Sequence, residues 1–257
     1  MGTQLSLRAV QFNRINTQYF RIIKSTFNYF MKNESHNSNS NLVKDIIIGM
    51  SDGLTVPFAL TAGLSGVLNT NHLIIVSGLS EIAAGCISMG LGGYLAGESE
   101  VEHYETELKR EFSEIERVPE EELKEVQGIL TDLGVEESLS NQVAIQISKD
   151  KNLWADFMMK LELKMEKPAK NRASKSASTI ALSYLVGGFI PLSPYIIFSK
   201  SKTGFYVSCV VTILALIIFG YLKSKMTGQP VIKGTFKVAL TGIIAATAAY
   251  ILAKAIS

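Results

Sequence analysis

Long apolar runs alternate with polar and charged stretches along the chain. The first run, from Ile46 to Leu68, has 23 residues and one ionisable side chain, Asp52. At about 1.5 Å per residue, a helix of this length can cross a hydrocarbon core of about 30 Å. Comparable runs follow at 72–97, 177–198, 203–222 and 234–256. The pattern predicts an all-α integral membrane protein with five transmembrane helices.

The stretch between the second and third runs is helical in pattern but too charged for a membrane. The second run continues from Glu98 as a charged helix, and Pro119 suits the first turn of another helix. Two more helices are predicted near 136–149 and from about residue 153. In chain order we expect a polar, disordered tail at 1–40, helices one and two at 41–97, an acidic helical domain at 98–167, and helices three to five at 168–257.

Charge is unevenly distributed, although the net charge of the 257 residues is only +2. Residues 98–167 hold 19 of the 23 acids but nine of the 25 bases, so this segment carries −10 and the rest carries +12. The asymmetry argues against nucleic-acid binding and favours cations as partners of the acidic domain. Bases cluster on one side of the predicted bilayer. By the positive-inside rule the N-terminus and residues 98–167 are cytoplasmic, and five spans place the C-terminus on the opposite side.

Two acids lie inside the predicted membrane helices. A carboxylate costs at least roughly 2.5 kcal/mol there, so Asp52 and Glu81 are expected to face a bundle interior and to mark an ion or proton path. The alternative is an acid that only pairs with another helix for stability. Met89 follows Glu81 by eight residues. Its soft sulfur near two carboxylates favours a transition metal such as Fe²⁺ over Ca²⁺ or Mg²⁺, whereas Met alone more often fills a core gap.

Carboxylates of the acidic domain are spaced so that they share helix faces. They are Glu100, Glu107, Glu111 and Glu114 on the first helix, Glu122 and Glu125 on the second, and Glu162 with Met158 at i, i+4 on the fourth. Like charges on one face repel each other. The pattern therefore favours a cation site over the alternative of solvated surface glutamates, and His103 is a further candidate ligand although a lone histidine is more often a surface residue.

Two motifs carry a resemblance to a known family: DIIIGMSDGLTVPFALTAGLSG at the first span and SEIAAGCISMGLGGYLAGESEVEHY at the second. Together with the glutamate-rich insert before three closing spans, they resemble the vacuolar iron transporter family, including its yeast-type calcium-sensitivity-complementing iron and manganese transporters. The resemblance covers about residue 42 to the end. It implies a homodimer of five-helix subunits that exports cytosolic Fe²⁺ into an acidic, vacuole-like compartment in exchange for protons, with a lumenal C-terminus.

The resemblance also implies roles for residues of this chain. Asp52, Glu81 and Met89 would line the translocation path at the dimer interface. The metal-binding set of the cytoplasmic domain would be Glu111, Glu114, Glu122, Glu125, Met158 and Glu162, and Glu100, Glu107 and His103 are additional candidates.

Several functions stay open at this point. Within transport, the alternative is a Mn²⁺ or broad divalent cation exporter. Outside transport, the glutamates could form a membrane-anchored carboxylate ferroxidase or a metal sensor, although Glu100 and His103 supply only one Glu-x-x-His pair of the two that a di-iron site usually uses. A transporter and not an enzyme is expected, with Fe²⁺ and H⁺ as substrates, Mn²⁺ or Zn²⁺ as alternative metals of the acidic domain, and no prosthetic group. Its other partners are the lipid bilayer and a second copy of the chain.

Overall fold

The structure, a computed structural model, describes the backbone of residues 35–257 and side chains from Asn41 onward. Every regular element in this range is an α-helix. The helices are α2 (Ser35–Val67), α3 (Asn71–Arg117), α4 (Pro119–Asp132), α5 (Glu137–Ile147), α6 (Lys151–Leu161), α7 (Arg172–Ile197), α8 (Ser201–Met226) and α9 (Val231–Ile256). Five of them, α2, α3, α7, α8 and α9, are long and apolar enough to cross a membrane. The predicted all-α class and the five predicted spans are confirmed.

Two helices extend further than the apolar runs. α3 continues without a break for 47 residues, which confirms the predicted continuation beyond Glu98. α2 begins at Ser35, so residues 35–40, predicted as part of the polar tail, are helical. A helix that is already nucleated by an apolar run adds further residues at little cost, which explains this extension into a Ser- and Asn-rich segment. The rest of the predicted tail lies outside the described residues.

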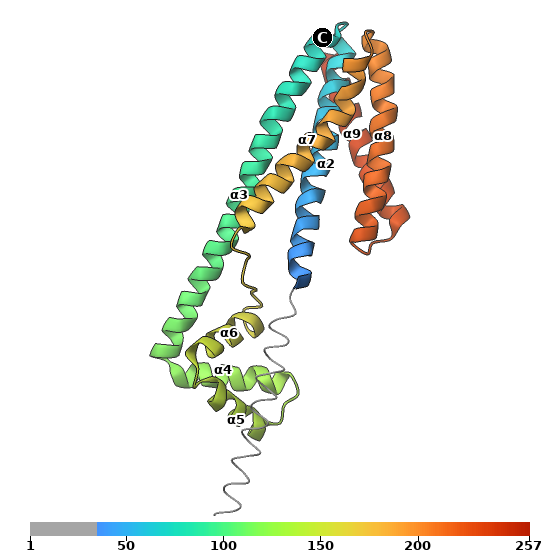
Figure 1. Cartoon of the computed structure of the whole chain (residues 1–257). Coiled ribbons are helices and arrows are strands. Elements are labelled where there is room, and N and C mark those ends of the chain that lie inside the picture. Colours follow the sequence, from blue (N-terminus) through green and yellow to red (C-terminus); the bar gives the residue numbers. More distant parts are fainter. Residues whose placement is uncertain (1–34) are drawn as a thin grey trace, which may run out of the picture. The chain divides into compact units, whose positions relative to one another are not determined.

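The chain divides into two compact units, which are treated separately below. Residues 39–98 and 170–257 form one unit, here called the bundle, and residues 99–169 belong to the other, here called the inserted domain. In the bundle, α7 packs against both α2 and α3 (Figure 1). A Cβ atom at Gly53 would come within 2.8 Å of Tyr184 Cα, and one at Gly97 within 2.7 Å of Ala173 Cα. Only glycine allows these backbones to approach so closely.

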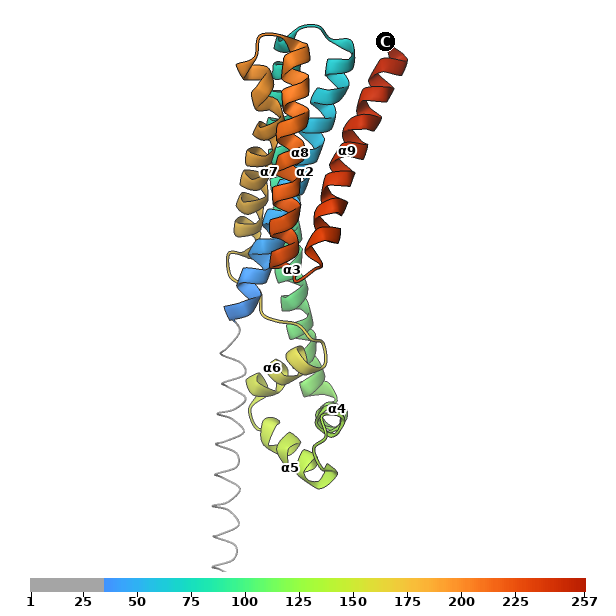
Figure 2. The ribbon, with the colours of Figure 1, turned by 90° about the vertical axis from the view of Figure 1, so that its right-hand side faces the viewer.

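Side-chain bonds join the helices at both ends of the bundle. At one end, the Asn71 amide donates to the carbonyls of Phe198 and Tyr195. At the other end, Arg172 pairs with Asp45. Figure 2 shows that the α2–α3 and α7–α8 links lie at the same end as the C-terminus. Residues 98 and 170, where the chain leaves and re-enters the bundle, therefore share the opposite end.

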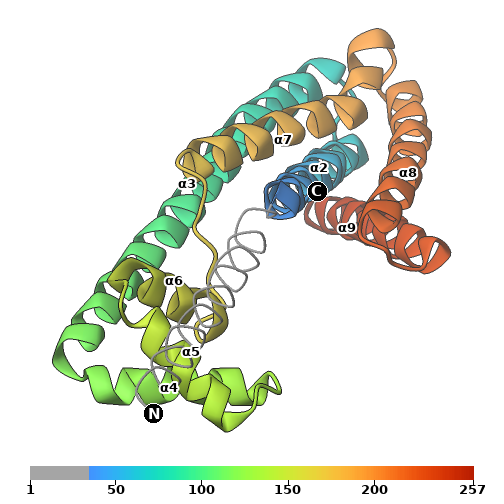
Figure 3. The ribbon, with the colours of Figure 1, turned by 60° about the horizontal axis from the view of Figure 1, so that its bottom comes forward.

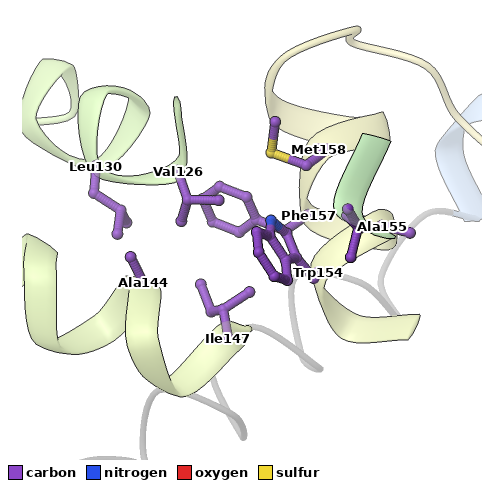
Figure 4. Close-up of a cluster of buried hydrophobic side chains, with 9 residues drawn as sticks. Val126, Leu130, Ala144, Ile147, Trp154, Ala155, Phe157 and Met158 are labelled. Carbon is purple, nitrogen blue, oxygen red and sulfur yellow. The ribbon is translucent and has the colours of Figure 1, made fainter. Parts of the chain in front are cut away.

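The inserted domain packs α4, α5 and α6 with the last turns of α3 (Figure 3). Its core consists of apolar residues that recur at helical spacing (Figure 4): Ile115, Val126, Leu130, Ala144, Ile147, Trp154, Ala155, Phe157 and Met158. The Asp150 carboxylate accepts bonds from the backbone N–H groups of Asn152 and Leu153 at 3.1 and 3.2 Å, which caps the start of α6. This core fixes the helices that carry the glutamates.

Candidate metal pathway and acidic cluster

Asp52 lies on α2 and is partly buried in the bundle. The glycines beside it, Gly49 and Gly53, face α7, where a Cβ would meet the backbone of Ile180 or Tyr184. These two glycines, four residues apart, form the face of α2 that packs closely on α7. Asp52 therefore lies on α2 between two positions of close approach to α7.

Glu81 on α3 is joined to α7 by a hydrogen bond. The Tyr184 hydroxyl donates to Glu81 Oε1, and Tyr184 is one of the most buried side chains of the bundle. Gly85 leaves room for the Tyr184 ring, since a Cβ at this position would overlap it. The other carboxylate oxygen, Oε2, is buried and has no hydrogen-bond partner among the described residues. That oxygen is the one available to a cation.

Tyr184 lies beside the segments that carry both intramembrane acids. Its hydroxyl bonds Glu81, and its backbone packs against Gly53, the residue that follows Asp52. Sequence reasoning did not find Tyr184, because nothing in the third apolar run distinguishes this tyrosine from a packing residue.

Met89 is partly buried on α3. It lies eight residues, or about 12 Å along the helix axis, beyond Glu81. Nearby Gly92 differs from the other glycines of this helix, because no described atom lies within 4 Å of the place where its Cβ would be. In the same part of α3, it is Gly90, Gly93 and Gly97 that face α7. The surface beside Met89 is thus uncovered in the single chain.

The inserted domain buries two carboxylates, Glu111 of α3 and Glu122 of α4, with exposed fractions of 1% and 5%. Each has an Oε2 atom with no hydrogen-bond partner in the described part of the chain. Burial, together with neighbouring glutamates, raises the pKa of Glu111 to about 7 and that of Glu122 to about 7. Buried carboxylate oxygens without a partner are rare in folded proteins, and such an oxygen can hold a proton or bind a cation.

Other predicted ligands surround this pair. Glu114 and Glu162 act electrostatically on both buried carboxylates, and Glu125 acts on Glu122 and Glu162. Burial, followed by the charge of Glu125, also raises the pKa of Glu162. The structure therefore groups the five glutamates whose role the resemblance implied. We call Glu111, Glu114, Glu122, Glu125 and Glu162 the acidic cluster.

The remaining predicted ligands are placed differently. Glu107 joins the edge of the acidic cluster through Arg110, whereas Glu100 and His103 are exposed on an earlier part of α3. Met158 is fully buried in the apolar core (Figure 4). Within residues 35–257, no three Asp, Glu, His or Cys side chains stand together at metal-binding geometry. Carboxylates of the acidic cluster would have to turn toward one point to hold an ion.

Two cations near these sites were not predicted as functional. Arg110 contacts three carboxylates of α3, at spacings of three, one and four residues, so the sequence did contain this signal. Arg172 is one of the bases beside the predicted spans, and its guanidinium donates to Asp45 at 2.7 Å and 3.4 Å. Asp45 and Arg172 are 127 residues apart, and no local pattern connects them.

Comparison with known proteins supports one family. The sequence profile of the VIT family matches residues 43–254. The chain belongs to the VIT family. Vacuolar iron transporter 1 of Tulipa gesneriana is 50% identical over 223 residues, which cover 87% of this chain and 90% of that protein. Vacuolar iron transporter 1 of Arabidopsis thaliana is 48% identical, with 87% and 89% covered. Protein CCC1 of Saccharomyces cerevisiae is 38% identical over 237 residues, with 84% and 73% covered.

The resemblance inferred from the two motifs is thereby confirmed. In this VIT family chain, the matched segment contains both intramembrane acids, Met89 and the whole acidic cluster. The first 42 residues lie outside it.

Proposed function

We propose that this VIT family chain moves Fe²⁺ from the cytosol into an acidic vacuole in exchange for protons. The observation that carries the proposal is that Tyr184 bonds Glu81 and packs against Gly53, next to Asp52, inside a bundle of membrane-length helices. Placing a carboxylate in a membrane costs free energy, so acids in such a position normally form part of an ion path. The names of the tulip and Arabidopsis relatives, vacuolar iron transporters, support the choice of iron and of the compartment.

The exchange follows from competition at the carboxylates. Fe²⁺ binds to ionised oxygens, so a carboxyl group must release its proton before it can coordinate the metal. Glu81 Oε2, which no described group occupies, and the Asp52 carboxylate would bind the ion, and the Met89 sulfur would favour Fe²⁺ over harder cations. Protons from an acidic lumen would then displace the metal on the far side.

The inserted domain supplies the cytosolic end of this route in our proposal. We place residues 98–167 and the N-terminus in the cytoplasm, and the C-terminus in the lumen, following the distribution of bases. The acidic cluster would collect Fe²⁺ and raise its local concentration near the bundle. Glu111 and Glu122 are buried, and the Oε2 atom of each has no described hydrogen-bond partner, which supports metal binding by these carboxylates.

A second copy of the chain would complete the pathway. The face of α3 that carries Gly92 also holds Met89 and Leu95 one turn away on either side, and Leu95 is 52% exposed. Small residues allow close helix contacts in membranes, so this face suits another α3 helix. We therefore propose a homodimer in which Met89 lies near the subunit boundary.

The deciding measurement is Fe²⁺ uptake into proteoliposomes with an acidic interior. Wild-type protein should take up Fe²⁺ only with the pH gradient, and Asp52→Asn should reduce uptake to background while remaining folded. Asp132→Asn, which removes the same charge from an exposed position at the end of α4, is the matched control and should transport normally. Normal uptake by Asp52→Asn would remove Asp52 from the mechanism.

Two further results would redirect the proposal. If Mn²⁺ inhibits the uptake of labelled Fe²⁺ as strongly as unlabelled Fe²⁺ does, a broad divalent exporter is favoured, since oxygen ligands hold Mn²⁺ readily. Metal binding without any uptake by the wild type would favour a membrane-anchored sensor.

A further inference from the structure

Arg110 is placed among the carboxylates of α3, next to the acidic cluster. We infer that its guanidinium is the resident counter-ion of the acidic cluster and that a divalent metal must displace it in order to bind. The inference rests on the proposed function of the acidic cluster as a metal site. It makes Arg110 the residue that sets the affinity of this site for metal.

Three separate ion pairs place Arg110 at the cluster. Its Nη1 atom is 3.2 Å from Glu107 Oε2, Nη2 is 3.9 Å from Glu111 Oε1, and Nε is 3.5 Å from Glu114 Oε2. One guanidinium thus serves three carboxylates and uses a different nitrogen for each. It occupies the space between them instead of pairing with one.

The charge of Arg110 also reaches carboxylates on other helices. Neighbouring glutamates raise the pKa of Glu122 at the start of α4 and of Glu162 after α6, and the charge of Arg110 lowers both. In the described part of the domain, it is the base that acts on all three of the most perturbed glutamates, Glu111, Glu122 and Glu162. Without metal, Arg110 is therefore the main positive charge that offsets their mutual repulsion.

The geometry suits a displaceable ion better than a fixed scaffold. A guanidinium that holds a carboxylate in position is usually buried and makes two parallel bonds to it. The Arg110 side chain is 51% exposed, and two of its three contacts are 3.5 Å or longer. A long side chain with this exposure can swing into solvent when a divalent cation takes its place.

If metal displaces Arg110, removing this side chain should destabilise the metal-free protein and favour the metal-bound protein. The metal-free state loses its counter-ion, whereas the metal-bound state loses only a competing charge. Arg110→Gln should therefore bind metal more tightly and melt at a lower temperature without metal. Lys109→Gln is the matched control, because Lys109 is exposed on the same helix and the substitution removes the same charge.

The experiment uses the full chain in detergent and Mn²⁺, which does not oxidise in air, as the probe. Calorimetric titration of the wild type and of Glu122→Gln identifies the binding step that belongs to the acidic cluster. For that step, Arg110→Gln should lower the Kd about fivefold, which is the fold-change expected from losing a partly exposed ion-pair network. Lys109→Gln should stay within about twofold. Arg110→Lys keeps the charge and should also stay near the wild type.

Each outcome bears on one of the two proposals. If the wild type shows no step that Glu122→Gln removes, the acidic cluster is not a metal site and the proposed function of the domain fails. If that step exists but Arg110→Gln leaves it unchanged or weakens it, the counter-ion inference is overturned while the metal site stands. Equal weakening by Arg110→Gln and Arg110→Lys would identify the guanidinium as a positioning group. Should Arg110→Gln unfold without metal, purification in Mn²⁺ and titration with a chelator give the same Kd from the loaded side.

Discussion

The Tyr184 hydroxyl on α7 donates a hydrogen bond to Glu81 Oε1 on α3, 103 residues away in the chain. This bond fixes one oxygen of the carboxylate and leaves the other, Oε2, without a described partner. Tyr184 thereby decides which oxygen of Glu81 can meet a cation. It acts through Glu81, so it is a positioning residue of the proposed pathway.

Tyr184→Phe should slow Fe²⁺ uptake about tenfold. A hydrogen bond to a charged group contributes about 1.5–3 kcal/mol, and its loss leaves the Glu81 carboxylate free to rotate away from the metal. The KM for Fe²⁺ should rise more than kcat falls, because the first effect is on binding. Proteoliposome uptake over a range of Fe²⁺ concentrations measures both constants.

Tyr195→Phe is the control for that substitution. Tyr195 is an equally buried tyrosine of the same helix, but its hydroxyl is 2.8 Å from Ser65 Oγ and not near an acid. Its loss should lower stability slightly and leave the KM unchanged. A rise of the KM in both variants would contradict the specific role of Tyr184.

Gly53→Ala should destabilise the bundle. The added Cβ would lie 2.8 Å from Tyr184 Cα, and a backbone atom cannot move aside as a flexible side chain can. Overpacking of this kind costs about 1–3 kcal/mol. Thermal unfolding in detergent should show a lower midpoint for Gly53→Ala, whereas Gly128→Ala on α4, where the Cβ meets no described atom within 4 Å, should not lower it.

Breaking the Asp45–Arg172 pair should weaken the end of the bundle where residues 98 and 170 lie. Asp45 is 3% exposed, and removing one partner of a buried pair leaves an uncompensated charge, at a cost of about 3 kcal/mol. Arg172→Leu and Asp45→Leu should each lower the unfolding midpoint. The double variant should be more stable than the sum of the two losses, and strict additivity would show that the pair does not contribute as a unit.

The acidic cluster should make both stability and metal affinity depend on pH. Folding raises the pKa of Glu111 and of Glu122 from the ordinary value of 4.5 to about 7. Between these values the folded state holds more protons than the unfolded state. The contribution of these groups to stability is therefore complete below pH 4.5 and is lost as the pH rises through about 7.

The affinity of the acidic cluster for metal should change with pH in the opposite direction to the stability. The carboxylates bind metal only when ionised, so Mn²⁺ affinity should increase as the pH rises through about 7. Unfolding midpoints with and without Mn²⁺ at several pH values test both statements. The double substitution Glu111→Gln and Glu122→Gln should flatten the two profiles, and a metal-free wild type that gains stability over this pH range would refute the assignment.

The sequence alone determined the helices and the candidate chemistry. The apolar runs, the continuous helix beyond Glu98 and the Pro119 start of α4 are local signals, because helix formation depends on neighbouring residues. The intramembrane acids were also identified from local sequence, because a charged residue within an apolar run is unusual by itself. The contacts of Arg110 with its neighbours on α3 are also local and could have been predicted from the spacing.

Only the tertiary structure decided which residues meet across helices. Tyr184 and Arg172 are ordinary residues of their own segments, and their roles come from Glu81 and Asp45 on distant helices. Met158 had ligand chemistry in the sequence but lies in the apolar core of the inserted domain. The physical reason is common to these cases: hydrophobic periodicity specifies that a face is buried, but the rotation and close approach of packed helices specify what that face contacts.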